Sequence, residues 1–283
     1  MTVLSPNDLR DWLACLQPDE GKSAIAVLKV SVDESGTHGG APALVVTACV
    51  GTPKGWTRIL RKWRPRAANY PKGYHATQAR DEDNLFLASL LQPHLEASMA
   101  VVIPYEVFKA VVPHEHRSRF GAEYATAIRA CVHVLAHWCD NYWYDWTTWV
   151  LETGHKGENS ARRFLDSILG LPASHVHSQA WVGKNDLVTH APDVVSYAIV
   201  STMESARPAS TRLLAEVRKS TMVRAFDRPT LEEAVAKGYD TIKQQRRTAL
   251  QARKQRKNAS KEALSADDAL PGVSWEAPTS EHE

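Results

Sequence analysis

Two short apolar, β-branched runs near the N-terminus constrain the fold more than any other feature of this chain. Residues 24–32 (AIAVLKVSV) and 43–50 (ALVVTACV) have the length and composition of strands, and the segment between them contains Gly39 and Gly40. Two such runs joined by a glycine-containing connection predict a β-hairpin. The sheet is therefore expected to begin with two antiparallel strands.

The rest of the chain alternates between helical and strand periods. After the hairpin we expect, in order, a helix at 56–63, a helix at 77–91, a strand at 97–105, a helix at 119–139, a strand at 145–152, a helix at 160–169, a strand at 174–182 and a helix at 191–206. This order predicts an α/β fold in which a mixed sheet is flanked by helices. A further helix is expected at 5–15, and helical structure resumes after Arg207.

Composition bounds the class of protein. The 283 residues are 43% hydrophobic and 23% charged, as in ordinary globular domains. No apolar run approaches the roughly 20 residues that cross a bilayer, and the first residues lack the pattern of a signal peptide. The four cysteines are scattered through predicted core segments, which is typical of reduced thiols. We therefore expect a cytoplasmic protein that does not associate with membranes.

Charge is distributed unevenly along the C-terminal part. Residues 237–261 hold nine basic residues and one acidic residue, whereas residues 262–283 hold six acids and no base. We predict an α/β domain with an N-terminal helix over 1–210, a helical extension with a basic face over 211–261, and an acidic, disordered tail over 262–283. The basic face is either a solvated surface or a nucleic-acid contact, and the residues expected to make that contact are Lys243, Arg246, Arg247, Arg253, Lys254, Arg256 and Lys257.

Three carboxylates follow from this arrangement as candidate site residues. Asp33 comes directly after the first predicted strand, Glu152 ends the fourth, and Asp193 lies in the first turn of the last core helix. In open α/β sheets, active sites form beyond the carboxyl ends of strands. Three acids that converge there repel one another, and a divalent cation offsets that repulsion. Bound Mg²⁺ or Mn²⁺ would orient a water molecule and stabilise charge that develops on a phosphate.

Each of these acids also has a purely structural interpretation. Asp, Ser and Gly after Val32 favour a tight turn, Glu152 could be an exposed strand end, and the helix dipole alone favours an acid at Asp193. These alternatives stay open from the sequence alone.

The segment VSVDESGTHGG followed by ALVVTACVG resembles the opening of the bacterial domain-of-unknown-function 3800 family, whose first strand ends in Asp-Glu-Ser-Gly. The likeness continues at residues 73–76 (GYHA), 150–152 (VLE) and 190–193 (HAPD). The resemblance implies an RNase H-like fold, in which nucleases, resolvases and transposases hold metal ions between acidic residues.

Several further residues near these acids in the sequence are candidates for the site. His75 is expected to orient a phosphate or a water molecule. Where the family has a glutamate this chain has Gly73, so that carboxylate is either missing or supplied by one of the acids at 81–83. The secondary candidates are Glu34, Ser35, Glu82, His155 and His190.

The leading hypothesis is a metal-dependent nuclease that hydrolyses nucleic-acid phosphodiester bonds, with DNA or RNA as its partner. Gly73 favours an alternative, a non-catalytic nucleic-acid-binding or protein-interaction module of a mobile-element or phage-defence complex. A third hypothesis is a small-molecule phosphohydrolase or nucleotidase. A protein partner or a homodimer fits each of these.

Overall fold

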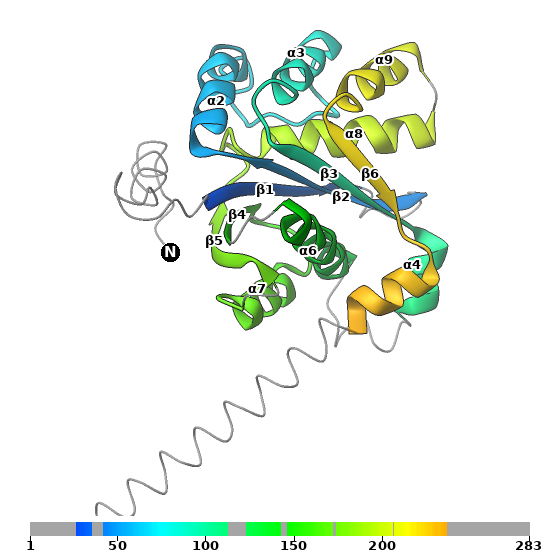
Figure 1. Ribbon diagram of the computed structural model, residues 1–283. Coiled ribbons are helices and arrows are strands. Elements are labelled where there is room, and N and C mark those ends of the chain that lie inside the picture. The colour runs from blue at the N-terminus through cyan, green and yellow to red at the C-terminus, as the bar shows by residue number, and fades with distance from the viewer. Residues whose placement is uncertain are drawn as a thin grey trace, which may run out of the picture. The chain divides into compact units, whose positions relative to one another are not determined.

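The computed structural model of the chain (Figure 1) describes residues 27–35, 42–112, 123–142, 146–171, 174–205 and 207–236. The chain forms two units, Met1–Tyr239 and Asp240–Glu283, and all the described residues belong to the first unit. The helix predicted at 5–15, the basic segment at 237–261 and the acidic segment at 262–283 lie outside the described residues.

The described residues form one sheet of six strands, in the order β5-β4-β1-β2-β3-β6. The strands are β1 (Val27–Ser35), β2 (Ala43–Gly51), β3 (Ala97–Pro104), β4 (Trp146–Glu152), β5 (Val176–Val182) and β6 (Thr221–Ala225). The strand β2 pairs antiparallel with both β1 and β3, and every other neighbouring pair is parallel. The predicted hairpin is therefore confirmed.

Helices cover both faces of the sheet (Figure 1). One face carries α2 (Pro53–Ala67), α3 (Asp81–Leu91), α8 (His190–Glu204) and α9 (Pro208–Val217), and the other carries α6 (Glu123–Tyr142) and α7 (Glu158–Ile168). A short helix, α4 (Tyr105–Val111), follows β3 directly. The predicted α/β fold class, a mixed sheet flanked by helices, is confirmed. None of the helices in the described ranges is long and apolar enough to span a membrane.

The helix α8 lies across the two central strands. All nine residues of β2 are buried, because helices pack on both of its faces. Two buried hydrogen bonds hold α8 and its preceding loop on this surface. The Ser196 hydroxyl donates to Thr47 Oγ1 at 2.8 Å, and the Ser31 hydroxyl donates to the Val188 carbonyl at 3.0 Å. These contacts fix where α8 begins relative to β1 and β2.

The prediction was wrong in placing the edge of the α/β domain at residue 210. The segment after that residue completes α9 and then forms β6, which pairs parallel with β3. The run TMVRA is five residues long and mostly exposed, so neither its length nor its hydrophobic pattern marks it as a strand. A helix at 228–236 follows β6, and the Asp227 carboxylate caps its start by accepting a hydrogen bond from the Thr230 amide at 3.0 Å.

Candidate metal centre

Two of the predicted acids lie at neighbouring positions near the carboxyl ends of the parallel strands β1 and β4. The parallel register pairs Val32 with Leu151, so Asp33 and Glu152 follow at neighbouring positions. Asp33 is also the register partner of Thr47 on β2, and β1 continues to Ser35. Residues 33–35 are therefore strand and not a turn, which removes the turn interpretation of this motif.

The third acid, Asp193, comes to the same end of the sheet on α8. Ser196 lies three residues after Asp193, close to one helical turn along α8, and its hydroxyl bonds Thr47. Thr47 is the residue that pairs with Asp33 across the hairpin. The three predicted ligands thus come from three different elements, β1, β4 and α8, and α8 packs on β1.

A loop before α3 holds the Asp193 carboxylate. Its Oδ2 accepts a hydrogen bond from the Ala76 amide at 2.9 Å, and it lies 3.7 Å from Nδ1 of His75. The His75 side chain is 47% exposed, so its ring stays accessible beside the acid. Two of the predicted site residues, His75 and Asp193, therefore lie beside each other.

Glu152 lies between two groups that can carry positive charge. Its Oε1 is 3.8 Å from His155 Nε2 and 3.8 Å from Lys184 Nζ. The His155 ring stacks on Tyr124, with centroids 4.8 Å apart. Glu152 is only 12% exposed, which excludes the interpretation of a solvated strand end.

Residues 33–35 are described through their backbone alone. Among the side chains that the structure does describe, no group of three or more His, Cys, Asp and Glu residues lies close enough to hold a metal ion. The backbones of Glu34 and Ser35 lie in β1, where they pair with Val46 and Val45 of β2.

Gly73, which replaces an expected glutamate, has a structural reason of its own. Its φ of +97° lies in the left-handed region, which favours glycine. A Cβ at this position would lie 2.7 Å from Asn185 Oδ1 and 3.4 Å from the Lys184 carbonyl oxygen. The chain passes close to the loop before α8 here, and a glutamate would require a different backbone.

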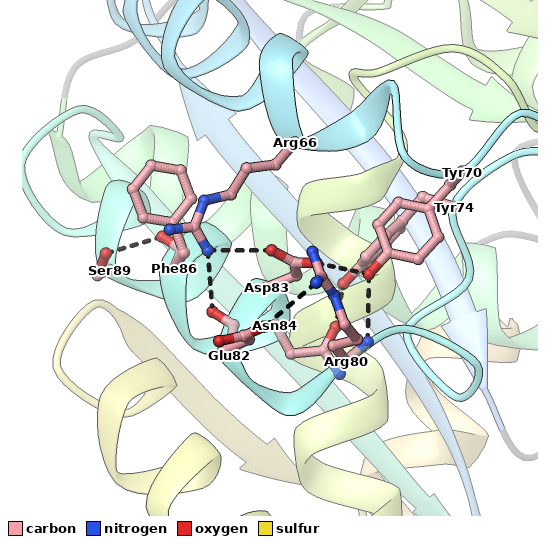
Figure 2. A network of polar contacts seen from close by, with 9 residues as sticks. All are labelled: Arg66, Tyr70, Tyr74, Arg80, Glu82, Asp83, Asn84, Phe86 and Ser89. Atoms are coloured by element: carbon pink, nitrogen blue, oxygen red, sulfur yellow. Dashed lines mark hydrogen bonds and ion pairs between the residues drawn. The ribbon is translucent and has the colours of Figure 1, made fainter.

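The acids at the start of α3 do not replace that glutamate. The buried Asp83 carboxylate accepts hydrogen bonds from the Tyr70 hydroxyl at 2.7 Å, Arg66 at 3.0 Å and Arg80 at 2.9 Å (Figure 2). Burial would raise the pKa of Asp83, but these three donors outweigh it and hold the pKa below its usual value. Glu82 is 70% exposed and lies 3.4 Å from Arg80. Both acids therefore belong to an ion cluster that fastens α3 to α2.

This cluster continues into the loop that holds Asp193. The Asn84 side chain donates to the Ala76 carbonyl at 2.9 Å, and the Tyr74 hydroxyl donates to Asn84 Oδ1. Because the Ala76 amide binds Asp193, the buried Asn84 positions the acid indirectly. Asn84 is not among the predicted site residues, although an amide on the apolar side of α3, which is buried, is the kind of signal that marks such a role.

His190 is a core residue. It is 3% exposed, and its Nδ1 accepts a hydrogen bond from the Trp63 indole at 2.9 Å. Burial lowers the pKa of His190 to about 4, so the ring is neutral at pH 7. A buried acid that the sequence did not indicate, Asp186, lies in the loop before α8, and burial raises the pKa of its carboxyl.

No protein-family model matches the chain, and no curated protein matches it. Its resemblance to the domain-of-unknown-function 3800 family stays a prediction. Among solved structures, it is similar to RNase HII from Archaeoglobus fulgidus in complex with PCNA, at 12% identity and a TM-score of 0.36, over 67% of this chain and 88% of that one. It is also similar to Bst-RNase HIII in complex with Mn²⁺, at 13% identity and a TM-score of 0.36, over 69% of each chain. Similarity at this level carries no inference about activity.

Proposed function

We propose that this chain is a divalent-metal-dependent nuclease that hydrolyses nucleic-acid phosphodiester bonds. One observation carries the proposal. The β1–β4 register brings Asp33 beside Glu152, and α8 brings Asp193 to the same end of the sheet. Acids gathered from three elements at the carboxyl ends of parallel strands are typical of a site for a cation and a phosphate.

The donor set fits Mg²⁺ or Mn²⁺, because both ions prefer oxygen ligands and all three proposed ligands are carboxylates. Asp33, Glu152 and Asp193 would hold the ion. When bound, such an ion lowers the pKa of a coordinated water and stabilises negative charge on a phosphoryl oxygen.

The neighbouring residues position these acids and attract the substrate. The Ala76 amide fixes the orientation of the Asp193 carboxylate. His75, half exposed beside that acid, can donate a hydrogen bond to a phosphate oxygen. Lys184 is 60% exposed and 3.8 Å from Glu152, so its ammonium group meets a polyanion as it approaches.

A cleavage assay tests this function. Labelled single- and double-stranded DNA and RNA are incubated with the protein and Mg²⁺ or Mn²⁺, with mononucleotides in a parallel arm for the phosphohydrolase hypothesis. We expect cleavage by the wild type and a loss of about 100-fold or more in Asp33→Asn, because a ligand is removed. Asp140→Asn is the matched control, since Asp140 is 65% exposed and pairs with His175. Undiminished cleavage by Asp33→Asn would contradict the assignment.

Gly73 favours a second candidate function, a binding module without catalysis. Its left-handed backbone, with φ of +97°, would strain a glutamate at that position. In this case the protein binds nucleic acid with a steep dependence on salt but takes up no Mn²⁺. The basic residues from Lys243 to Lys257, which lie outside the described residues, are the predicted contact in either function.

A further inference from the structure

A second basic segment lies within the folded unit. From Gly36 to Arg80 the sequence contains no aspartate or glutamate. Six of the basic residues in this stretch lie on α2, and they are Lys54, Arg58, Arg61, Lys62, Arg64 and Arg66. The helix therefore has six cationic side chains and no acidic one.

The cations of α2 point to solvent while its apolar side forms core. Trp56, Ile59 and Trp63 are each at most 1% exposed. The first five cations, from Lys54 to Arg64, are exposed. Among the described residues, only Arg66 of the six lies within ion-pair distance of a carboxylate, that of Asp83.

The stability of α2 itself accounts for only part of these charges, because the helix dipole favours Arg64 and Arg66 in the last turn but not the cations before them. A helix dipole favours acids in the first turn, but α2 has Lys54 there and no acid. Lys54, Arg58 and Lys62 follow one another at four-residue spacing, where like charges repel. The helix begins instead through its Thr52 cap, whose hydroxyl oxygen accepts from the Gly55 amide at 3.1 Å. The charges are therefore better explained by an anionic ligand.

A neighbouring histidine responds to this positive charge. Lys62 Nζ lies 3.2 Å from His94 Nε2. The pKa of His94 is lowered, first by burial and then by the positive charges of Lys62 and Arg58. Lys62 and Arg58 of α2 therefore both lower the pKa of His94.

The C-terminal half of α2 contacts the first turn of α8, which carries Asp193. The Trp63 indole bonds His190, which is three residues before Asp193 on α8. Beyond α2, exposed Lys72 precedes Gly73, which approaches the carbonyl of Lys184. Because Lys184 lies beside Glu152, cationic side chains continue from α2 to the acids.

We propose that the outward face of α2, formed by Lys54, Arg58, Arg61, Lys62 and Arg64, binds the sugar–phosphate backbone of a nucleic acid and leads it to the candidate metal centre. At about 1.5 Å per residue, Lys54 and Lys62 are about 12 Å apart along the helix. That length matches three or four phosphates of one duplex strand, at about 3.4 Å each. The apolar side of α2 is buried in the core, so no apolar face remains to enter a membrane.

This inference rests on the proposed function only for the class of ligand, since binding requires no cleavage. The test is fluorescence anisotropy with a labelled duplex and a single strand of about 30 nucleotides, over a range of salt concentrations. The full chain is used with Asp33→Asn present throughout and without divalent metal. The test variant is Arg58→Gln/Arg61→Gln/Arg64→Gln. The matched control, Arg207→Gln/Arg212→Gln/Arg218→Gln, removes three exposed arginines at and around α9.

The α2 variant is expected to bind at least about 10-fold more weakly, and the slope of log K against log salt is expected to fall by about two to three for duplex DNA. The α9 control is expected to keep the affinity of its parent within about 2-fold. Equal binding by the α2 and α9 variants overturns the proposal. Capture by anionic phosphatidylserine vesicles through α2, with no nucleic-acid binding, also overturns it.

The two proposals fail in different ways. A wild type that never cleaves, together with weaker binding by the α2 variant, refutes the nuclease and supports this surface. Unchanged binding by the α2 variant refutes this surface even if the wild type cleaves. Circular dichroism checks the fold of each variant, and Lys54→Gln/Arg58→Gln/Lys62→Gln tests the same face if the first set fails to fold.

Discussion

At the scale of single residues, His190 gives a prediction about pH. The pKa of its buried ring is lowered to about 4, whereas an unfolded histidine titrates near about 6.5. Between these values the unfolded chain binds a proton that the native chain does not, so stability falls as the pH falls through this window. The protonation of His190 is therefore expected to lower the free energy of unfolding by about 3 kcal/mol over the whole window.

Urea unfolding at several pH values between about 4 and 7.5 measures this effect. In His190→Gln the acid-induced loss of stability is expected to shrink by most of that amount. His137→Gln, at an exposed position of α6, is the matched control and is expected to keep the wild-type dependence. If His190→Gln kept the wild-type dependence of unfolding free energy on pH, the conclusion that the His190 ring is buried and neutral would be wrong.

The residue scale also shows what the sequence could predict of the site. Asp33, Glu152 and Asp193 were predicted at strand ends and a helix start because such ends are visible as changes of hydrophobic period, and their role as ligands stays a prediction. Asn84 was not found, because its role depends on a loop that folds back onto α3. The conformation of Gly73 was also not predictable, since its φ of +97° is set by its approach to the loop before α8.

At the scale of elements, α2 gives a prediction that reverses an ordinary helix propensity. Alanine in place of a helical glycine usually stabilises by about 1 kcal/mol. A Cβ at Gly55 would instead overlap the backbone carbonyl oxygen of His94, in the turn after α3. We expect Gly55→Ala to lower the free energy of unfolding by about 1–3 kcal/mol.

Thermal and urea unfolding of Gly55→Ala and Thr57→Ala measure this difference. Thr57 is exposed on the same helix, so its replacement is expected to change stability by less than about 0.5 kcal/mol. A stabilised Gly55→Ala would show that α2 and the turn at His94 are not in contact.

The elements themselves were predicted unevenly. The hairpin of β1 and β2 and the alternation that follows were clear, because buried strands and amphipathic helices differ in period. The prediction for α2 covered only 56–63, since its start depends on the Thr52 cap and Pro53 and its cationic residues obscure the apolar pattern. The strand β6 was missed because an edge strand with four exposed residues has no buried face to reveal it.

At the scale of the whole folded unit, the pairing of distant segments creates the candidate site. The register of β1 with β4 joins residues separated by more than a hundred positions, and α8 joins them from still farther along the chain. A sequence pattern predicts that such acids lie at strand ends but not which strands are neighbours. The order of the strands in the sheet therefore shows which acids are neighbours, which the sequence pattern did not predict.

The central claim is that Asp33, Glu152 and Asp193 share one divalent cation, and titration calorimetry with Mn²⁺ tests it most directly. We predict that the wild type binds Mn²⁺ and that Asp33→Asn, Glu152→Gln and Asp193→Asn each weaken binding by about 10-fold or more. Glu82→Gln, which alters an exposed acid paired with Arg80, is expected to bind like the wild type. A wild type that binds no Mn²⁺, or binding unaffected by all three substitutions, would contradict the claim.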